Sequence, residues 1–429
     1  MRWENLPAEI VSSRPIDAEV FAPRSTGPVS IGLELLDAEG TVWNARASAP
    51  VGHDERLRIP EIRTAGVPGW FGLQAALAPD VDDPQEYLRQ TRGRFGRPFW
   101  GDSRALKCRL TAKGESGQFA SVDSLMRQFP KEVSRTKLAE GGLRGVLYTP
   151  KRARSVAIIC MSGSGGGVDM VFAPALAAAG FVALSLALFG FDGRPPHHQR
   201  IALDYVADAA RWLAAESRTR TVAILGTSRG AEAALLVALH FPAVTRLVFG
   251  VAPGSVVTPG WSPELQNAGP AWTVRGRSLP YSAGRLNELI PPLESRSEGL
   301  LTQTVSTAPF YEEIFRDTAM DSAARINLAD LAVPVYAFVG LDDALWPSAL
   351  ACRQLAAMAP AGRFLYKIFE HAGHLLAPPG WPTSLSNRVF HPVENRFFAT
   401  GGTQRGNALA AQAMWYEILK VLEGLSRRD

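Results

Sequence analysis

A Gly-x-Ser-x-Gly turn at residues 226–230 contains the residue best suited to chemistry, Ser228. An apolar run at 221–225 precedes the turn, and an Ala-rich segment beginning at Ala231 follows it. This order predicts a strand, a sharp turn and a helix, with glycines where strand and helix approach closely. Such a turn holds its serine in a strained backbone conformation and lifts the hydroxyl clear of the sheet. We therefore predict a nucleophile, and the alternative is an ordinary strand–helix turn.

A serine at its ordinary pKa attacks poorly, so it needs a general base and an acid that orients the base. In α/β-hydrolases these partners follow the serine in the order acid, histidine, each in a loop after a later strand. Two apolar runs downstream, 335–339 and 364–369, are each followed by candidate residues in this order. The sequence therefore predicts an α/β-hydrolase fold with a Ser-His-Asp triad.

Each loop offers two candidates. Asp342 and Asp343 follow the first run, and we expect Asp343 to be the acid because it stands third after a glycine and is followed four residues later by a proline. Asp342 is then a turn residue that bonds its own backbone. In the second loop, Ala-Gly-His forms a compact turn that lets His374 reach over the sheet edge, while His371 is solvated or lies behind it. The remaining histidines are expected at the surface or in packing: His53, His197, His198, His240 and His391.

The glycine-rich segment 162–167 follows another apolar run and suits an oxyanion hole, because an approaching acyl group must touch backbone there. We expect Ser164 or Gly165 to donate a backbone N–H beside that of Arg229. A phosphate-cradling loop is the alternative, but no Gly-Lys-Ser/Thr follows and Asp169 would repel phosphate.

Nearly the whole chain resembles the acyl-CoA thioesterases and bile-acid-CoA:amino-acid N-acyltransferases. The resemblance rests on a collinear set of motifs. These are Gly-Ser-Gly-Gly-Gly at 163–167, Gly-Phe at 180–181, Ser-Arg-Gly-Ala-Glu at 228–232, Gly-Leu-Asp-Asp-Ala-Leu-Trp at 340–346, Ala-Gly-His-Leu-Leu-Ala-Pro-Pro at 372–379, and Gly-Gly-Thr at 401–403 followed by Ala408, Ala411, Gln412 and Trp415.

The resemblance implies two domains, an all-β sandwich and linker at 1–135 and an α/β-hydrolase catalytic domain at 136–429. Strand-like alternation at Val29–Leu36 and a turn before 41–47 predict a hairpin in the first domain. The stretch 121–144 is expected to link the domains. A cap is expected at 253–324, where the family pattern fits least well, with Trp261 and Trp272 lining an acyl pocket or merely packing. Substrate binding is assigned to Trp272 and to Trp346 of the acid loop.

The resemblance also implies the reaction, which is cleavage of an acyl thioester, with acyl-CoA as substrate, through an acyl-enzyme on Ser228. Some relatives carry Cys as the nucleophile and conjugate the acyl group to an amino acid, so the serine favours hydrolysis over transfer. Acyl transfer to an amine, a carboxylesterase and a non-catalytic binding protein are the alternatives. Where relatives commonly have a histidine, this chain has Asn407, and no role is carried over to it.

Composition agrees with this interpretation. The chain has 429 residues, 46% of them hydrophobic, and a formal charge of +4. Acidic residues near the N-terminus argue against a secretory signal, and three cysteines, Cys108, Cys160 and Cys352, cannot all pair, so a reduced, cytoplasmic setting is expected. No basic run marks a nucleic-acid site and no uninterrupted apolar stretch marks a membrane span. We expect a small-molecule partner and no cofactor or metal other than coenzyme A within the substrate, while the oligomeric state stays open.

Overall fold

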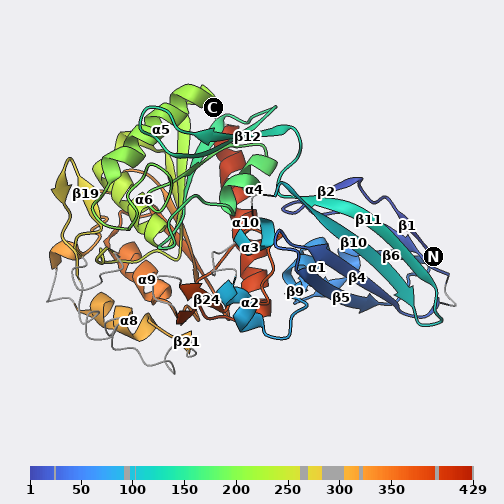
Figure 1. The fold of residues 1–429 in the computed structure, drawn as a ribbon. Coiled ribbons are helices and arrows are strands. Elements are labelled where there is room, and N and C mark those ends of the chain that lie inside the picture. The colour runs from blue at the N-terminus through green and yellow to red at the C-terminus, as the bar shows by residue number, and fades with distance from the viewer. Residues whose placement is uncertain are drawn as a thin grey trace.

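The chain forms a strand-rich N-terminal part and a larger C-terminal part in which helices flank a central sheet (Figure 1). The computed structural model describes residues 1–23, 26–90, 97–101, 103–260, 269–282, 304–317, 322–391 and 396–427, and the structural statements below concern these residues.

The N-terminal part has one sheet of six strands in the order β2-β11-β10-β4-β5-β9, one of three in the order β1-β3-β6, and a two-stranded pair of β7 and β8. The predicted hairpin is confirmed, because β4 (Val29–Leu36) pairs antiparallel with β5 (Val42–Ala49). Alternate side chains of β4, such as Ile31 and Leu33, enter the same core as Val20 of the smaller sheet, which gives a sandwich. The other elements of this part are β1 (Arg2–Glu4), β2 (Glu9–Val11), β3 (Glu19–Phe21), β6 (Arg56–Arg58), β7 (Arg63–Thr64), β8 (Val67–Pro68), α1 (Gly69–Ala75), β9 (Ala78–Pro79), α2 (Pro84–Gln90), α3 (Arg97–Trp100), β10 (Ala105–Gly114) and β11 (Phe119–Arg127).

The expectation that 121–144 links the two domains is wrong. β11 extends to Arg127 and pairs with β10 along its whole length, whereas β12 (Val133–Leu138) already belongs to the central sheet. The connection is therefore only residues 128–132, and the C-terminal sheet begins three residues before the predicted boundary at 135/136. The polar outer face of β11 explains the error, because a strand with one solvated face lacks the apolar run expected of a buried one.

The central sheet has eight strands in the order β12-β13-β15-β14-β17-β18-β22-β23. β12 and β13 pair antiparallel and β13 pairs antiparallel with β15, while all pairings from β15 to β23 are parallel. This arrangement confirms the predicted α/β-hydrolase fold. The further strands are β13 (Gly145–Pro150), β14 (Val156–Met161), β15 (Val182–Leu186), β17 (Thr221–Thr227), β18 (Leu247–Val251), β22 (Val335–Gly340) and β23 (Phe364–Phe369).

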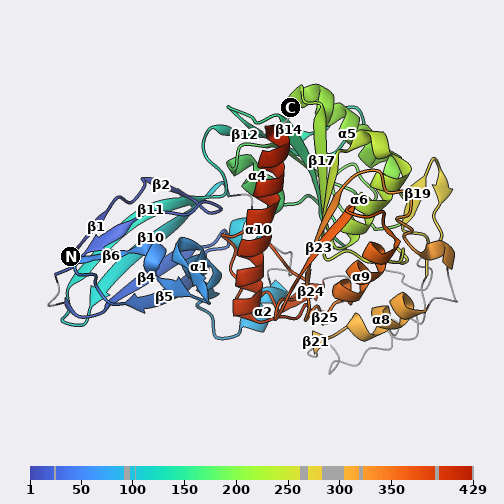
Figure 2. The ribbon, with the colours of Figure 1, turned by 180° about the vertical axis from the view of Figure 1, so that it is seen from behind.

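Helices cover both faces of this sheet, so its inner strands are buried on both sides. Along β14, Val156, Ile158 and Cys160 face the core that contains α4 (Phe172–Ala178) and α10 (Gln404–Ser426). The alternate residues face the core of α5 (Leu203–Ser217), α6 (Arg229–His240) and α9 (Ser348–Met358). Figure 2 shows α10 running between the central sheet and the sandwich, and its side chains share one core with both.

The region expected to be a cap is described in part. Within it, β19 (Trp272–Val274) and β20 (Arg277–Ser278) form a small sheet with β16 (Ile201–Ala202), and α8 (Ala308–Arg316) is a helix, so these described pieces include both strand and helix. Trp261 lies outside the described residues. A second small sheet joins β21 (Thr304–Val305), β24 (Arg388–His391) and β25 (Arg396–Ala399).

Candidate active site

Ser228 stands between the end of β17 and the start of α6, as the sequence predicts. Its backbone has φ 56° and ψ −118°, a conformation that L-residues rarely adopt and that costs about 1–3 kcal/mol. A Cβ on Gly226 would collide with the carbonyl of Gly230, and one on Gly230 would lie 2.6 Å from the carbonyl oxygen of Met161. The two glycines are therefore required by close backbone approach, and the turn is tightly held by its surroundings.

His374 and Asp343 come together although 31 residues separate them. Asp343 Oδ2 lies 2.9 Å from His374 Nδ1, and both side chains are almost completely buried. Asp343 also accepts hydrogen bonds from the backbone N–H groups of Leu345 and Trp346 and from the Ser348 hydroxyl. Four donors thus surround this carboxylate, an arrangement that fixes its direction.

The two rejected candidates form a separate, looser pair. Asp342 Oδ2 lies 3.7 Å from His371 Nδ1, and the side chains are 46% and 75% exposed. Exposed pairs at this distance contribute little to stability and do not hold a ring in one orientation. The geometry therefore favours Asp343 and His374 over Asp342 and His371.

The glycine-rich turn after β14 lies directly against Ser228. A Cβ on Gly163 would be 3.0 Å from Ser228 Cβ and 3.6 Å from its hydroxyl oxygen. The N–H groups of Gly166 and Gly167 shape the turn by bonding to the carbonyls of Gly163 and Phe189. Around Gly165, in contrast, a Cβ would meet no described heavy atom within 4 Å, so this part of the turn borders open space.

Ser228, Asp343 and His374 follow β17, β22 and β23, whose parallel carboxyl ends meet at one edge of the sheet. In open α/β sheets this edge is where ligands bind. Arg229 begins α6, so its backbone N–H has no partner within the helix and is well placed to donate. The described residues thus place a serine, a histidine–aspartate pair and a glycine turn at the same edge.

Asn407 of α10 supports the histidine loop, a role that we did not predict from the sequence. Its Oδ1 accepts a 2.8 Å hydrogen bond from the N–H of Gly373, next to His374, and its Nδ2 donates to Ser386 Oγ at 2.8 Å. The N–H of His374 itself bonds to the carbonyl of Thr400 at 2.7 Å. These contacts hold the histidine loop from two sides.

The segment 400–403 contacts the loop of Asp343 and the loop of His374. Gly401 forms a β-bridge with Asp343, and Gly402 forms one with Ala372. Both glycines have positive φ, 77° and 74°, and a Cβ on either would collide with the neighbouring loops. The paired glycines were a usable sequence signal, because consecutive positive-φ positions are accessible mainly to glycine.

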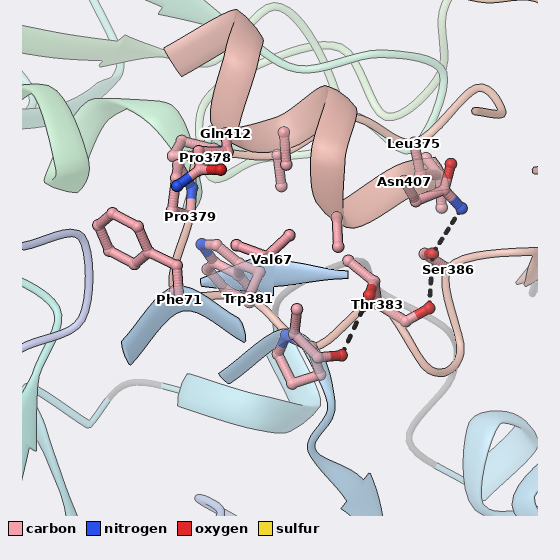
Figure 3. Close-up of a pocket in the computed structure, with 16 residues that line it drawn as sticks. Val67, Phe71, Leu375, Pro378, Pro379, Trp381, Thr383, Ser386, Asn407 and Gln412 are labelled. Atoms are coloured by element: carbon pink, nitrogen blue, oxygen red, sulfur yellow. Dashed lines mark hydrogen bonds between the residues drawn. The ribbon is translucent and has the colours of Figure 1, made fainter. Parts of the chain in front are cut away.

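A small cavity of about 20 Å³ lies beside this support, between α1, residues 375–386 and α10 (Figure 3). Phe71 and Trp381 lie on one side of it, and the Asn407–Ser386 hydrogen bond lies on the other. Its volume is no more than one or two waters need, so it is not an acyl pocket.

The tryptophans expected to bind substrate occupy different surroundings. The ring of Trp346 lies 5.7 Å from that of His374, and its Nε1 donates to the carbonyl of Ala252 at 3.0 Å. Trp272 is completely buried, and its Nε1 donates to Glu232 at 2.5 Å. The complete burial of Trp272 favours the alternative that this side chain packs in the interior. Its contact with substrate stays a prediction.

Within the described ranges, no three His, Cys, Asp or Glu side chains gather in a way that could hold a metal ion. No described helix is both long enough and apolar enough to cross a bilayer. Cys108, Cys160 and Cys352 are all unpaired and buried.

The sequence profile of the family described as "BAAT / Acyl-CoA thioester hydrolase C terminal" matches residues 201–425. The bile acid-CoA:amino acid N-acyltransferase of Mus musculus is 25% identical over 298 residues, which are 68% of this chain and 65% of that protein. The chain therefore spans slightly less than two thirds of this relative. Acyl-coenzyme A thioesterase 1 of Mus musculus is 24% identical over 420 residues, covering 94% of this chain and 91% of that protein. The mitochondrial acyl-coenzyme A thioesterase 2 of Homo sapiens is 26% identical over 406 residues, covering 91% and 77%.

Among solved structures, the chain is similar to a dienelactone hydrolase from Anabaena variabilis, with 18% identity and a TM-score of 0.34 over 57% of this chain and 88% of that one. A carboxylesterase from Bacillus subtilis matches with 14% identity and a TM-score of 0.36 over 57% and 86%.

Proposed function

The chain belongs to the BAAT/acyl-CoA thioester hydrolase family, and we propose that it hydrolyses an acyl-CoA to the free acid and coenzyme A through an acyl-enzyme on Ser228. The observation that carries the proposal is the buried 2.9 Å contact between His374 Nδ1 and Asp343 Oδ2, at the same sheet edge as the strained serine. A buried pair of this kind leaves the other ring nitrogen, Nε2, to exchange a proton with the serine.

In the proposed acylation step, Ser228 Oγ attacks the thioester carbonyl carbon while His374 Nε2 takes the hydroxyl proton. Asp343 accepts the Nδ1–H and stabilises the imidazolium that forms. The carbonyl oxygen becomes an oxyanion facing the N–H of Arg229 and those of the Ser164–Gly165 turn. The tetrahedral intermediate then collapses, the carbon–sulfur bond breaks, and the departing thiolate takes the proton from His374.

Deacylation repeats these steps with water. His374 Nε2 takes a proton from a water molecule, the resulting hydroxide attacks the ester carbonyl, and the carbon–oxygen bond to Ser228 breaks. The serine oxygen recovers the proton from His374, and the free acid leaves. Atoms and charges balance over the cycle without another co-reactant.

Serine supports hydrolysis over transfer to an amine. The acyl-enzyme would be an oxygen ester, which reacts less readily with amines than a thiolester does, so an amine gains less over water. Serine acyl-enzymes can nevertheless be captured by an amine when a pocket binds it and water is excluded. Transfer is therefore the alternative outcome that an experiment must separate.

The test is a product analysis. The protein is incubated with acyl-CoA thioesters of increasing chain length and with matched 4-nitrophenyl esters, in the presence and absence of glycine and taurine, and products are identified by mass. Free acid and coenzyme A from the thioesters support the proposal. Predominant amide product would establish acyl transfer instead, and turnover of oxygen esters alone would establish a carboxylesterase.

A further inference from the structure

The side chain of Arg229, the residue after the nucleophile, is buried in a network of its own. The side chain is 3% exposed, and Nη1 donates to Glu232 Oε2 at 2.8 Å. The same group bonds to the hydroxyl of Thr258, and Nη2 donates to the carbonyls of Thr258 and Pro259 at 2.9 and 2.8 Å. Nε lies 3.4 Å from His198 Nδ1. All three guanidinium nitrogens of Arg229 therefore have hydrogen-bond partners behind the nucleophile turn.

Glu232 completes the network from the same helix. Its carboxylate is fully buried and accepts from Arg229, from Trp272 Nε1 and from the backbone of Thr258. Burial raises the pKa of Glu232, and these three donors oppose that rise. All three partners of Glu232 donate a hydrogen bond to it. The carboxylate can accept all of them only when it is ionised.

A gain in folding stability does not explain the buried ion pair of Arg229 and Glu232. Desolvating two charges costs several kcal/mol per ion, and replacing a buried pair with packed apolar side chains is often neutral or stabilising. What the pair does achieve is geometric. It joins the first turn of α6 to residues 258–259, which begin the insertion between β18 and β22. The next residue, Gly260, packs against the backbone of His198 so closely that a Cβ there would collide with it.

We propose that the Arg229–Glu232 pair is a positioning element, which locks the N–H of Arg229 in place by tying the nucleophile turn to Thr258 and Pro259 at the start of the insertion. This inference rests on the proposed function, in which that N–H faces the oxyanion. An oxyanion hole works only when its donors are fixed before charge develops, so a displaced donor weakens the transition state more than it weakens substrate binding.

The main test replaces the whole pair with Arg229→Met and Glu232→Leu, so that no unpaired charge is left in the interior. We expect the thermal midpoint to stay within about 5 °C of wild type. The rate of Ser228 acylation by a 4-nitrophenyl ester should fall about tenfold or more, with KM nearly unchanged. Affinity for a trifluoromethyl ketone that mimics the tetrahedral intermediate should fall in parallel, which loss of packing alone would not cause.

The matched control is the exposed pair Asp208 and Arg211 of α5, which has the same three-residue spacing and a 2.6 Å contact. Arg211→Ala should leave acylation and inhibitor affinity unchanged. Should the double variant fail to fold, Thr258→Val carries the test, because it removes one acceptor of the guanidinium while preserving the ion pair. It should lower acylation several-fold without changing KM.

The labelling of Ser228 by a fluorophosphonate, followed by intact mass, separates this inference from the proposed function. If the wild-type protein is labelled but hydrolyses no acyl-CoA, the proposed function is overturned. The labelling rates of the variants then still test the inference. If the Arg229→Met/Glu232→Leu double variant and the Thr258→Val variant both fold, and both are labelled and acylated at the wild-type rate, the inference is overturned and the proposed function is not. Wild-type protein that resists labelling overturns both.

Discussion

The carboxylate of Asp343 meets the imidazole of His374 through a buried 2.9 Å contact, while the adjacent Asp342 faces the exposed His371 at 3.7 Å. Two neighbouring aspartates thus have opposite environments. The main chain after β22 turns Asp343 inward, where four donors surround it, and leaves the side chain of Asp342 46% exposed.

We expect Asp343→Asn to lower kcat by about three to four orders of magnitude, because an amide cannot stabilise the imidazolium and favours the wrong tautomer. Asp342→Asn should have only a mild effect. The measurement is steady-state hydrolysis of an acyl-CoA by both variants, with His371→Ala and His374→Ala assayed alongside. A greater loss in Asp342→Asn or in His371→Ala would show that the other pair is catalytic.

Gly163→Ala should lower kcat about tenfold or more, because the added Cβ would lie 3.0 Å from Ser228 Cβ and must displace either the serine or the glycine turn. Gly424→Ala is the control, since a Cβ there meets no described heavy atom within 4 Å. Both variants are compared by hydrolysis rate and thermal midpoint. Full activity in Gly163→Ala would mean that this turn does not touch the reacting serine.

Asn407→Ala should destabilise the protein by about 1–3 kcal/mol, because it leaves the N–H of Gly373 buried without its acceptor. It should also lower kcat, since this N–H adjoins His374. Urea unfolding and steady-state kinetics measure the two effects. Asn327→Ala is the control, at an exposed asparagine whose Oδ1 accepts from the nearby N–H of Ala329. A stable Asn407→Ala variant with normal kcat would remove Asn407 from the support of the histidine loop.

His198 should make the stability of the protein depend on pH. Burial, and then the charge of Arg229, lower the pKa of this histidine well below its ordinary value of 6.5. The unfolded chain therefore binds the proton first as pH falls below about 6.5, and the folded state loses stability there. Below that pH, down to the lowered pKa, the loss approaches about 1.4 kcal/mol per pH unit.

The difference between wild type and His198→Gln isolates this contribution, because glutamine still offers an acceptor to Arg229 but does not titrate. The urea midpoints of wild type and of His198→Gln are measured from pH 8 down to about pH 5. The midpoint of wild type should fall more steeply with pH, so that the two curves converge or cross. Equal slopes for the two proteins would show that His198 does not resist protonation in the folded state.

Local sequence was enough to predict the fold and the residues that follow strands. Ser228, Asp343 and His374 lie in the connections that follow β17, β22 and β23, and parallel strands place their carboxyl ends at one edge whatever the detailed packing. The hairpin of β4 and β5 was predictable for a similar reason, because alternation and turn chemistry act over a few residues.

Longer-range features were not predictable in this way. Asn407 acts on Gly373 because residues 400–403 pass between two loops. The paired glycines at 401–402 indicate a tight turn in the sequence, but they do not indicate which loops it contacts. The Trp-rich composition of the insertion predicted that Trp272 lines a pocket. In the structure its indole N–H instead donates to the buried carboxylate of Glu232 on α6. The polar outer face of β11 made a sheet strand resemble a linker.

Trapping the acyl-enzyme would show whether an acyl group passes through Ser228 to water. Wild-type protein is mixed with an acyl-CoA, quenched in acid at early times, and examined by intact mass and peptide mapping, while free acid is quantified with glycine or taurine present. We expect an added acyl mass on Ser228, its decay to free acid, and neither signal in Ser228→Ala. Undiminished acid release by Ser228→Ala, or decay of the intermediate mainly to amide, would contradict this expectation.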